Sequence, residues 1–330
     1  MKAIVCTKWG LPKAIELKEV EKPSPRDNEV LVEVHASSVT FSNQIFVNNR
    51  FFLFRLIAKK VMPETGIPGS DMAGRVVAIG RDVKQFKPGD EVYGDMFGRV
   101  KGAFAEYVCS PEHLLALKPA NLSFEEAAAV PESAHVALVG LRDYGKIKAG
   151  QKVLIYSASG GIGTFAVQIA KYYGAEVTGV CSTRNLELVH SLGADHVIDY
   201  TKEDCTRNGQ HYDLIFAVRK SPSIFAIKRA LSPGGIYVST AGPSPSRLFQ
   251  EFFIGPRIFK NSDKKVAVIN LQINQGNMVF IKELIEAGKV KPVIDRSYPL
   301  SQVPEAFRYY AKGHARGKVV ITVEHEQRES

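Results

Sequence analysis

A short run of small residues carries the strongest chemical signal in this chain. Residues 157–163 read SASGGIG and lie between an apolar run, 153–156, and a helix-type pattern that begins at Thr164. A glycine-rich turn between a strand and a helix brings backbone N–H groups close to a ligand, and the helix dipole favours negative charge there. The turn therefore predicts a pyrophosphate site. Its candidate contacts are Ser159, Gly160, Gly161, Ile162, Gly163 and Thr164.

The elements around this turn have the spacing of a dinucleotide-binding unit. The turn differs from the usual G-x-G-x-x-G because Ala158 stands at the first glycine. The helix carries apolar residues at helical spacing and ends at Gly174, and a second apolar run, 175–180, follows it. We predict a strand–helix–strand unit that binds a nicotinamide dinucleotide. The alternative is an ordinary glycine-rich turn in another α/β protein.

The end of the second strand indicates which nicotinamide cofactor fits. NAD sites place a carboxylate there for the ribose 2′-OH, whereas NADP sites use polar or cationic groups for the 2′-phosphate. Residues 181–185 read CSTRN, and the first carboxylate after them is Glu187. Ser182 can donate a hydrogen bond, and Arg184 can present a planar fork to a phosphate. We predict NADP(H) over NAD(H), the alternative being that Arg184 only faces solvent.

Composition is that of a soluble protein with room for two domains. The chain has 330 residues, of which 45% are hydrophobic and 23% charged, and no run approaches the ~20 apolar residues that cross a bilayer. The beginning, MKAIVCTKWG, lacks the apolar region of a signal peptide. Four scattered cysteines favour reduced thiols and a cytoplasmic location. The net charge of +9 comes without a run of five Lys or Arg, so nucleic acid is not expected as a partner.

The sequence contains two regions with different patterns of strands and helices. Up to about residue 122 the chain shows β-type runs and turn signals without helix–strand alternation, which favours an antiparallel barrel. From Ser123, where SFEE forms a capping box, strands and helices alternate, as in a parallel doubly wound sheet. The last strand, 318–323, again has the N-terminal pattern. We predict an α/β chain with one domain over 1–122 and 296–330 and a second over 123–295.

Six segments spread along the chain carry a family resemblance. They are GSDMAG at 69–74, KPGDEVYG at 87–94, ASGGIGTFAVQIAK at 158–171, SLGADHVIDY at 191–200, LSPGG at 231–235 and GKVVI at 317–321. Together they resemble the medium-chain dehydrogenase/reductase superfamily and, within it, the zinc-free quinone oxidoreductase group. The resemblance implies a GroES-like β-barrel catalytic domain, a Rossmann cofactor domain, an active site in the cleft between them, and a homodimer built largely through the cofactor domains. It adds Tyr200, Ala241 and Lys318 as candidate cofactor contacts.

The resemblance also predicts that no metal is bound. Zinc members of the superfamily have a Cys at the position of Thr40, a His in the segment of Ser70 and a second Cys near Glu132 or Ser133. Their loop of four cysteines has no counterpart in residues 95–109. None of these residues is a Cys or His that could bind zinc tightly, so we predict a zinc-free site.

A metal-free site favours reduction of a quinone or an α,β-unsaturated carbonyl. Oxidation of a simple alcohol needs a group that stabilises the alkoxide, whereas these acceptors need only hydrogen-bond donors and a proton source. The proton donor stays open, because relatives have a Tyr where this chain has Ile45, and water is an alternative. The candidate catalytic residues are Thr40, Asn43, Ser70 and Tyr93.

The acceptor is expected to be small and apolar. The segment 51–58, FFLFRLIA, is aromatic, and we expect it to be partly core and partly a flap over the site. Two other functions stay open. One is an alcohol dehydrogenase of the same superfamily with a rearranged metal site, and the other is a cofactor-binding protein that acts through contacts with RNA or protein.

Overall fold

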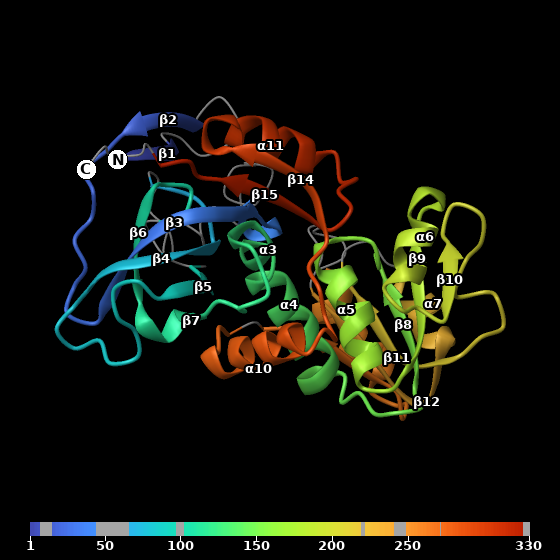
Figure 1. Cartoon of the computed structure of the whole chain (residues 1–330). Coiled ribbons are helices and arrows are strands. Elements are labelled where there is room, and N and C mark those ends of the chain that lie inside the picture. Colours follow the sequence, from blue (N-terminus) through green and yellow to red (C-terminus); the bar gives the residue numbers. More distant parts are fainter. Residues whose placement is uncertain are drawn as a thin grey trace. The chain divides into compact units, whose positions relative to one another are not determined.

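The computed structural model describes residues 1–6, 15–43, 66–96, 102–218, 222–240, 249–270 and 272–325. Ala241, Ile45 and the segment 51–58, with the predictions made on them, lie outside these ranges. The chain divides into two compact units, which we call unit 1 and unit 2 (Figure 1). Unit 1 comprises Met1–Glu132, Ile273–Ala287 and Pro292–Ser330, and unit 2 comprises Ser133–Gln272 and Gly288–Lys291.

Unit 1 is built on a seven-stranded sheet in the order β14-β15-β3-β4-β5-β7, with β6 also paired to β3. All pairs are antiparallel except β14 with β15. Its strands are β3 (Glu29–Val39), β4 (Asp71–Ile79), β5 (Glu91–Asp95), β6 (Tyr107–Pro111), β7 (Leu115–Leu117), β14 (Ile294–Pro299) and β15 (Lys318–Thr322). A separate hairpin joins β1 (Lys2–Cys6) to β2 (Ile15–Glu19). The last strand thus pairs with β3, which brings residues from both ends of the chain into one sheet.

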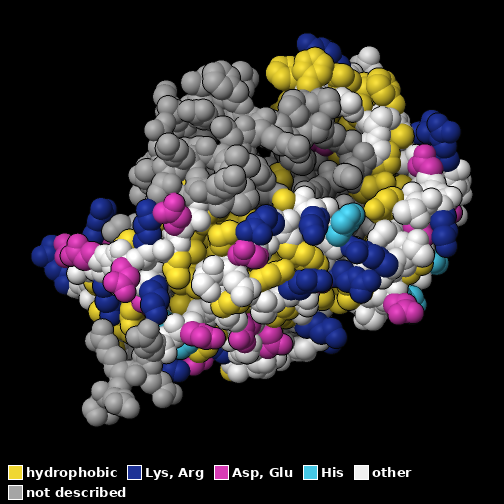
Figure 2. All heavy atoms as spheres, turned by 90° about the horizontal axis from the view of Figure 1, so that it is seen from above, with side chains coloured by type: hydrophobic (Ala, Val, Ile, Leu, Met, Phe, Trp, Pro, Cys, Tyr) yellow, Lys and Arg dark blue, Asp and Glu magenta, His cyan; other side chains and the backbone are white. Residues whose placement is uncertain are grey.

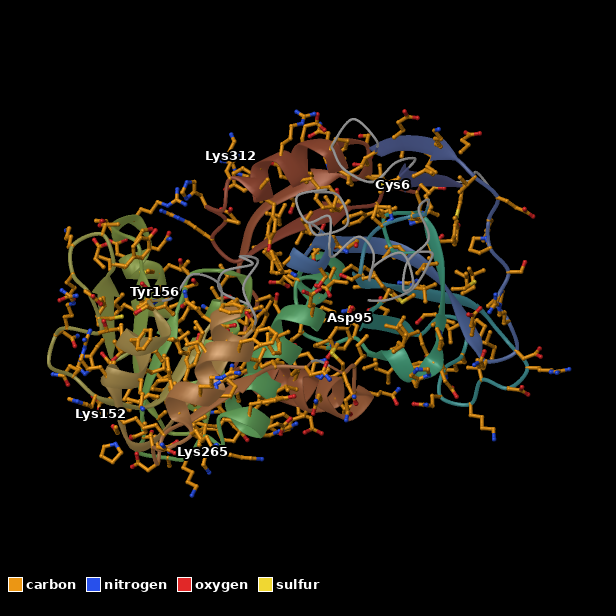
Figure 3. The ribbon with its side chains drawn as sticks, turned by 180° about the vertical axis from the view of Figure 1, so that it is seen from behind. Cys6, Asp95, Lys152, Tyr156, Lys265 and Lys312 are labelled. Atoms are coloured by element: carbon orange, nitrogen blue, oxygen red, sulfur yellow. The ribbon has the colours of Figure 1, made fainter. Side chains whose placement is uncertain are left out.

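Unit 2 contains a six-stranded sheet in the order β10-β9-β8-β11-β12-β13, and every pair in it is parallel. The strands are β8 (Lys152–Tyr156), β9 (Glu176–Cys181), β10 (His196–Asp199), β11 (Tyr212–Ala217), β12 (Leu231–Ser239) and β13 (Lys265–Val268). The strand order reverses between β8 and β11, and ligands of such sheets bind at the carboxyl ends of the strands at this switch point. Figure 3 labels Lys152 and Tyr156 at opposite ends of β8, and Tyr156 marks the carboxyl end. The predicted doubly wound parallel sheet is confirmed.

Helices connect these strands and cover the sheets. In unit 2 they include the end of α4 (Pro131–Leu138), η3 (Val139–Tyr144), α5 (Gly161–Tyr172), η4 (Thr183–Asn185), α6 (Leu186–Ser191), α7 (Ile224–Ala230), η5 (Gln250–Ile254) and α9 (Gly255–Phe259). Unit 1 holds η2 (Glu112–Leu114), α3 (Phe124–Ala128), α10 (Gln275–Glu286), η6 (Leu300–Gln302) and α11 (Val303–Ala311). The helix after the glycine-rich turn ends as its sequence indicates, because Gly174 adopts a φ of 77° just beyond α5.

The compact units differ from the predicted domain boundaries in two longer segments, described below, and in residues 292–295, which belong to unit 1. Residues 123–132 belong to unit 1, since α3 packs on β3 and β4. The capping box is present, with Ser123 Oγ accepting from the N–H of Glu126, but the helix it starts has only five residues. Residues 273–287 also belong to unit 1, because α10 packs against β7. In these two longer segments, contacts with strands of unit 1, and not the local helix pattern, determine to which unit the residues belong.

Candidate functional site

The turn after β8 ends in an uncapped helix N-terminus. Helix α5 starts at Gly161, its N-cap is Gly160, and no side chain caps it. The first N–H groups of such a helix have no partner within the helix. The turn itself is tight: Ser157 adopts a left-handed φ of 65°, and a Cβ on Gly163 would lie 2.1 Å from the Ser157 carbonyl oxygen. Among the described residues, a Cβ on Gly160 would come within 4 Å of that oxygen alone, at 3.5 Å, so they leave space beside this glycine.

Residues at the end of β9 lie beside this turn. Asn185 is buried, and its Nδ2 donates to Ser159 Oγ at 2.9 Å and to Ser182 Oγ at 3.2 Å. Arg184 is exposed in η4, and Tyr200 has an exposed fraction of 54%. The structure therefore links the glycine-rich turn to the segment that was predicted to select the cofactor. The link passes through Asn185, which the sequence did not single out.

A carboxylate also lies at this edge of the sheet. Strand β10 pairs in parallel with β9, which sets Asp199 opposite Cys181. Asp199 Oδ2 accepts from Thr183 Oγ1 at 2.5 Å, and Oδ1 accepts from Thr201 Oγ1 at 2.7 Å. The hydrogen bond from Thr183 is the main cause that lowers the pKa of Asp199. Sequence spacing missed this carboxylate because it arrives from the neighbouring strand and not from the end of β9.

In unit 1, three of the candidate catalytic side chains form one buried hydrogen-bonded group. Thr40 Oγ1 donates to Asn43 Oδ1 at 3.0 Å and lies 3.1 Å from Ser70 Oγ. The backbone N–H of Thr40 also donates to Asn43 Oδ1, at 3.2 Å. Ser70 Oγ lies 3.5 Å from the same Asn43 oxygen. Thr40 and Asn43 follow β3, whereas Ser70 immediately precedes β4, which pairs with β3.

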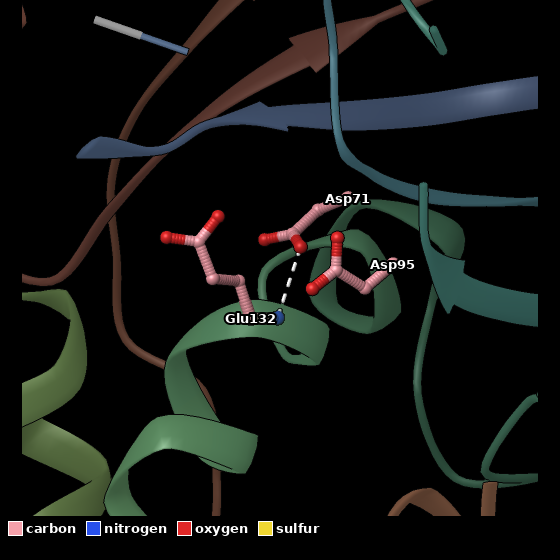
Figure 4. A group of neighbouring side chains, drawn as sticks. All are labelled: Asp71, Asp95 and Glu132. Carbon is pink, nitrogen blue, oxygen red and sulfur yellow. Dashed lines mark hydrogen bonds between the residues drawn. The ribbon is translucent and has the colours of Figure 1, made fainter. Parts of the chain in front are cut away.

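An acidic group with a lysine adjoins these hydroxyls. Asp71 Oδ2 accepts from Lys318 Nζ at 2.8 Å and from Ser38 Oγ at 2.9 Å, and Oδ1 accepts from the backbone N–H of Glu132 at 2.9 Å (Figure 4). Both side chains of the Asp71–Lys318 pair are buried. Burial opposes the charged ammonium, but the charge of Asp71, which Lys318 contacts directly, helps to outweigh it, and the pKa of Lys318 is raised. Lys318, a predicted cofactor contact, thus lies in unit 1 with its ammonium on Asp71.

The carboxyl of Glu132 lies next to this pair and is bound by hydroxyls. Oε1 accepts from Ser42 Oγ at 2.9 Å, and Oε2 accepts from Ser70 Oγ at 3.4 Å. Burial, followed by the charge of Asp71, raises the pKa of Glu132 above its usual value. In the sequence, Glu132 was noted only because zinc members of the superfamily have a metal ligand near it. Nothing in the local sequence indicated that it would contact the side chains of Ser42 and Ser70.

Tyr93, the fourth candidate catalytic residue, is held differently. Its side chain is fully buried, and its hydroxyl donates to the Met278 carbonyl oxygen in α10 at 2.7 Å. Burial and the nearby Glu286 raise the pKa of Tyr93. A hydroxyl with such a pKa is a weak proton donor, so the geometry favours a structural role for Tyr93 in joining α10 to β5.

Known protein families and solved structures resemble this chain in sequence and in fold. A family model described as an alcohol dehydrogenase GroES-like domain matches residues 26–120, and one described as a zinc-binding dehydrogenase matches residues 192–321. The 2-methylene-furan-3-one reductase of Solanum lycopersicum is 35% identical over 333 residues, covering 97% of this chain and 79% of that protein. The chloroplast envelope quinone oxidoreductase homolog of Arabidopsis thaliana is 33% identical over 316 residues, covering 93% of each. The quinone oxidoreductase structure from Coxiella burnetii has a TM-score of 0.87 at 28% identity, covering 98% of this chain and 99% of that one.

This chain belongs to the medium-chain dehydrogenase/reductase superfamily, in its quinone oxidoreductase-like branch. The predicted family and the predicted combination of a GroES-like domain with a Rossmann-type sheet are confirmed. The chain is therefore an oxidoreductase that uses a nicotinamide cofactor. The structure fits that cofactor, because α5 offers uncapped N–H groups and Gly160 leaves the space beside them open.

The acidic group of unit 1 suits a zinc ion poorly, although this superfamily has zinc members. Asp71, Asp95 and Glu132 place carboxylate oxygens within 4.8 Å of one another (Figure 4). Structural and catalytic zinc sites rely mainly on Cys and His, and this group has neither. A metal ion would also have to displace the Lys318 ammonium, since Asp71 already binds that cation.

Charged side chains of both signs lie on the surface of the protein. On the face shown in Figure 2, Lys and Arg side chains are interspersed with Asp and Glu side chains. Among the described residues, no helix is both long and apolar enough to cross a membrane. The cytoplasmic location remains a prediction, because one of the relatives is named for the chloroplast envelope.

Proposed function

We propose that this chain transfers a hydride from NADPH to a quinone or to an α,β-unsaturated carbonyl without a metal ion. The observation that carries the proposal is the buried group of Thr40, Asn43 and Ser70. It brings the Asn43 amide beside Thr40 and Ser70, the two residues that stand where zinc members of the superfamily have metal ligands. The names of the reductase and quinone oxidoreductase relatives support the same chemistry. When bound, NADPH supplies the hydride, and the protein must stabilise the oxygen that gains charge.

Asn43 is the best-placed donor for that oxygen. Its Oδ1 takes the hydrogen bonds from Thr40, which fixes the orientation of the amide. The Nδ2 hydrogens are then the part of the side chain that can serve a substrate oxyanion. Because the group is buried, such a hydrogen bond is stronger than it would be in water. After hydride reaches the substrate carbon, one proton on the oxygen or on the adjacent carbon completes the reduction.

NADPH is favoured over NADH by the residues at the end of β9. Ser182 and the exposed Arg184 can bind a 2′-phosphate. The carboxylate of Asp199, which lies near them, already accepts hydrogen bonds from Thr183 and Thr201, and Lys202 Nζ lies 3.9 Å from it. These contacts reduce its ability to serve a ribose 2′-OH, which is the usual task of a carboxylate in NAD sites.

We also propose the homodimer that the family resemblance implies. Among the described strands, β13 pairs only with β12, so it forms an edge of the unit 2 sheet. An unpaired strand edge can add a strand from a second copy. Light scattering of the purified chain measures the assembly directly, and the mass of a single chain would contradict a dimer.

Assays of cofactor consumption test the proposed function. We expect the purified protein to oxidise NADPH faster than NADH with 9,10-phenanthrenequinone and with 3-buten-2-one, and to be insensitive to 1,10-phenanthroline. The variant Asn43→Leu should lower kcat by about 10²–10³-fold, the range typical for loss of one oxyanion donor. Activity with simple alcohols that chelator abolishes would favour the alcohol dehydrogenase alternative. Bound NADPH without turnover across a broad panel of quinones and enones would contradict the proposal.

A further inference from the structure

We infer that Asn185 positions the hydroxyl groups of Ser159 and Ser182 so that both donate hydrogen bonds to the phosphate groups of the cofactor. The inference rests on the proposed function only in that the ligand is a phosphorylated nicotinamide dinucleotide. Asn185 is a positioning residue in this scheme, since it acts through the two serines and does not itself contact the phosphates.

The geometry joins two turns through one amide group. Ser159 lies in the turn after β8, directly before the N-cap Gly160, and Ser182 directly follows β9. The Nδ2 atom of Asn185 donates to the two hydroxyl oxygens, at 2.9 Å and 3.2 Å. Asn185 itself is anchored by its backbone N–H, which donates to the Ser182 carbonyl oxygen at 2.8 Å. Its exposed fraction of 5% shows that the side chain is part of the interior.

The hydrogen positions follow from counting donors and acceptors. An Asn amide has two N–H donors, and each serine hydroxyl has one hydrogen and can also accept. With both Nδ2 hydrogens directed to the serine oxygens, the hydrogen of each hydroxyl remains for a further acceptor. Phosphate oxygens are acceptors only, so hydroxyls oriented in this way match them.

The opposite orientation of the amide is less favourable. The Oδ1 atom of Asn185 is buried and has no partner among the described residues. If the amide were turned over, the two N–H donors would take that place, and two buried donors would be unsatisfied where one acceptor is now. The present orientation therefore has the lower cost, and it is the one that leaves both hydroxyl hydrogens for the ligand.

The two serines are placed to bind different phosphate groups of the cofactor. Ser159 adjoins the uncapped N-terminus of α5, where a pyrophosphate is expected. Ser182 lies at the end of β9, where the adenosine ribose and its 2′-phosphate are expected. A single side chain thus couples the pyrophosphate site to the site that distinguishes NADP from NAD.

The variant Asn185→Asp tests this arrangement with almost no change of shape. A carboxylate can only accept, so it would take the hydroxyl hydrogens of both serines and turn them away from the phosphates. We expect the dissociation constant of NADPH, measured by its fluorescence change on titration, to rise at least tenfold. Asn121→Asp, in unit 1, adds the same charge far along the chain from the two serines and should leave this constant within twofold of the native value.

A double-mutant cycle separates positioning from charge and from stability. Asn185→Ala should weaken NADPH binding several-fold in the native chain and have no further effect in a chain that already carries Ser159→Ala and Ser182→Ala. Melting temperatures of the cofactor-free variants show whether each is folded. An equal loss from Asn185→Ala in both backgrounds would overturn the inference, as would native affinity in a folded Asn185→Asp chain. If the native chain binds neither NADPH nor NADH, the proposed function itself fails, and the cycle is not needed to show it.

Discussion

At the scale of single residues, burial and neighbouring charge decide the protonation of Glu132. Its carboxyl is buried beside Asp71 and receives hydrogen bonds from Ser42 and Ser70. The cation of the group, Lys318, is bound to Asp71 and not to Glu132. Since burial and the charge of Asp71 both raise the pKa of Glu132, we expect this carboxyl to hold a proton at a pH where an exposed Glu has lost it.

Two amide substitutions test whether Glu132 is protonated while the neighbouring Asp71 is charged. Glu132→Gln keeps a neutral group of the same size, so we expect the free energy of unfolding to fall by less than about 1 kcal/mol. Asp71→Asn leaves the Lys318 ammonium buried without its counter-ion, and we expect a loss of about 3–5 kcal/mol. Urea unfolding of both variants at neutral pH gives the comparison. Equal losses from the two substitutions would mean that Glu132 is charged in the native protein.

Among the structural elements, the turn between β8 and α5 contains two glycines that have different functions. Gly163 allows the helix to approach the strand, because any Cβ there would collide with the Ser157 carbonyl oxygen. Gly160 has no such neighbour, and its backbone φ of −85° suits any residue. Its lack of a side chain therefore has a different use, which is to let a phosphate approach the helix N-terminus.

Alanine at each glycine should separate folding from cofactor binding. We expect Gly163→Ala to lower the free energy of unfolding by about 1–3 kcal/mol, the range typical of overpacking. Gly160→Ala should leave that free energy within about 0.5 kcal/mol and yet raise the dissociation constant of NADPH, since its Cβ lies where the ligand must come close. Denaturant unfolding and NADPH titration of the two proteins measure both effects. Native cofactor affinity in the Gly160→Ala protein would place the phosphates elsewhere.

At the scale of the whole molecule, buried histidine sets part of the response of stability to acid. His135 has an exposed fraction of 0% and lies on α4, in the part that belongs to unit 2. Burial, helped by the charge of Arg142, lowers the pKa of His135 to about 4. The unfolded chain takes up a proton there below pH 6.5, whereas the native chain does so only near pH 4.

The free energy of unfolding should therefore decrease as the pH falls from 6.5 to 4, by up to about 3 kcal/mol from this residue. His135→Gln cannot take up that proton. We expect the difference in unfolding free energy between native and variant chains to be constant above pH 7 and to shift in favour of the variant as the pH is lowered. Urea titrations at several pH values give this difference. Parallel pH profiles would show that His135 is not buried in its neutral form.

Elements with local sequence signals could be predicted without the structure. The apolar run of β8, the glycines of the turn and the period of α5 are each read from consecutive residues, and they predicted the parallel sheet and a cofactor site. The family was found from these and five further segments along the chain. Thr40 and Ser70 were found as candidates because they stand where zinc members of the superfamily have metal ligands, and Asn43 because it is close to Thr40 in the sequence. Their hydrogen bonds could not be read in the same way.

Contacts between residues far apart in the sequence could not be predicted in this way. Lys318 reaches Asp71 across 247 positions of the chain because β15 pairs with β3, which in turn pairs with β4. Asn185 reaches Ser159 because β8 and β9 are neighbours in the sheet, so that the turns following them lie side by side. Spacing along the chain specifies a helix or a strand, but the partner of a buried charge or amide depends on strand order and register, which arise from packing of the whole sheet.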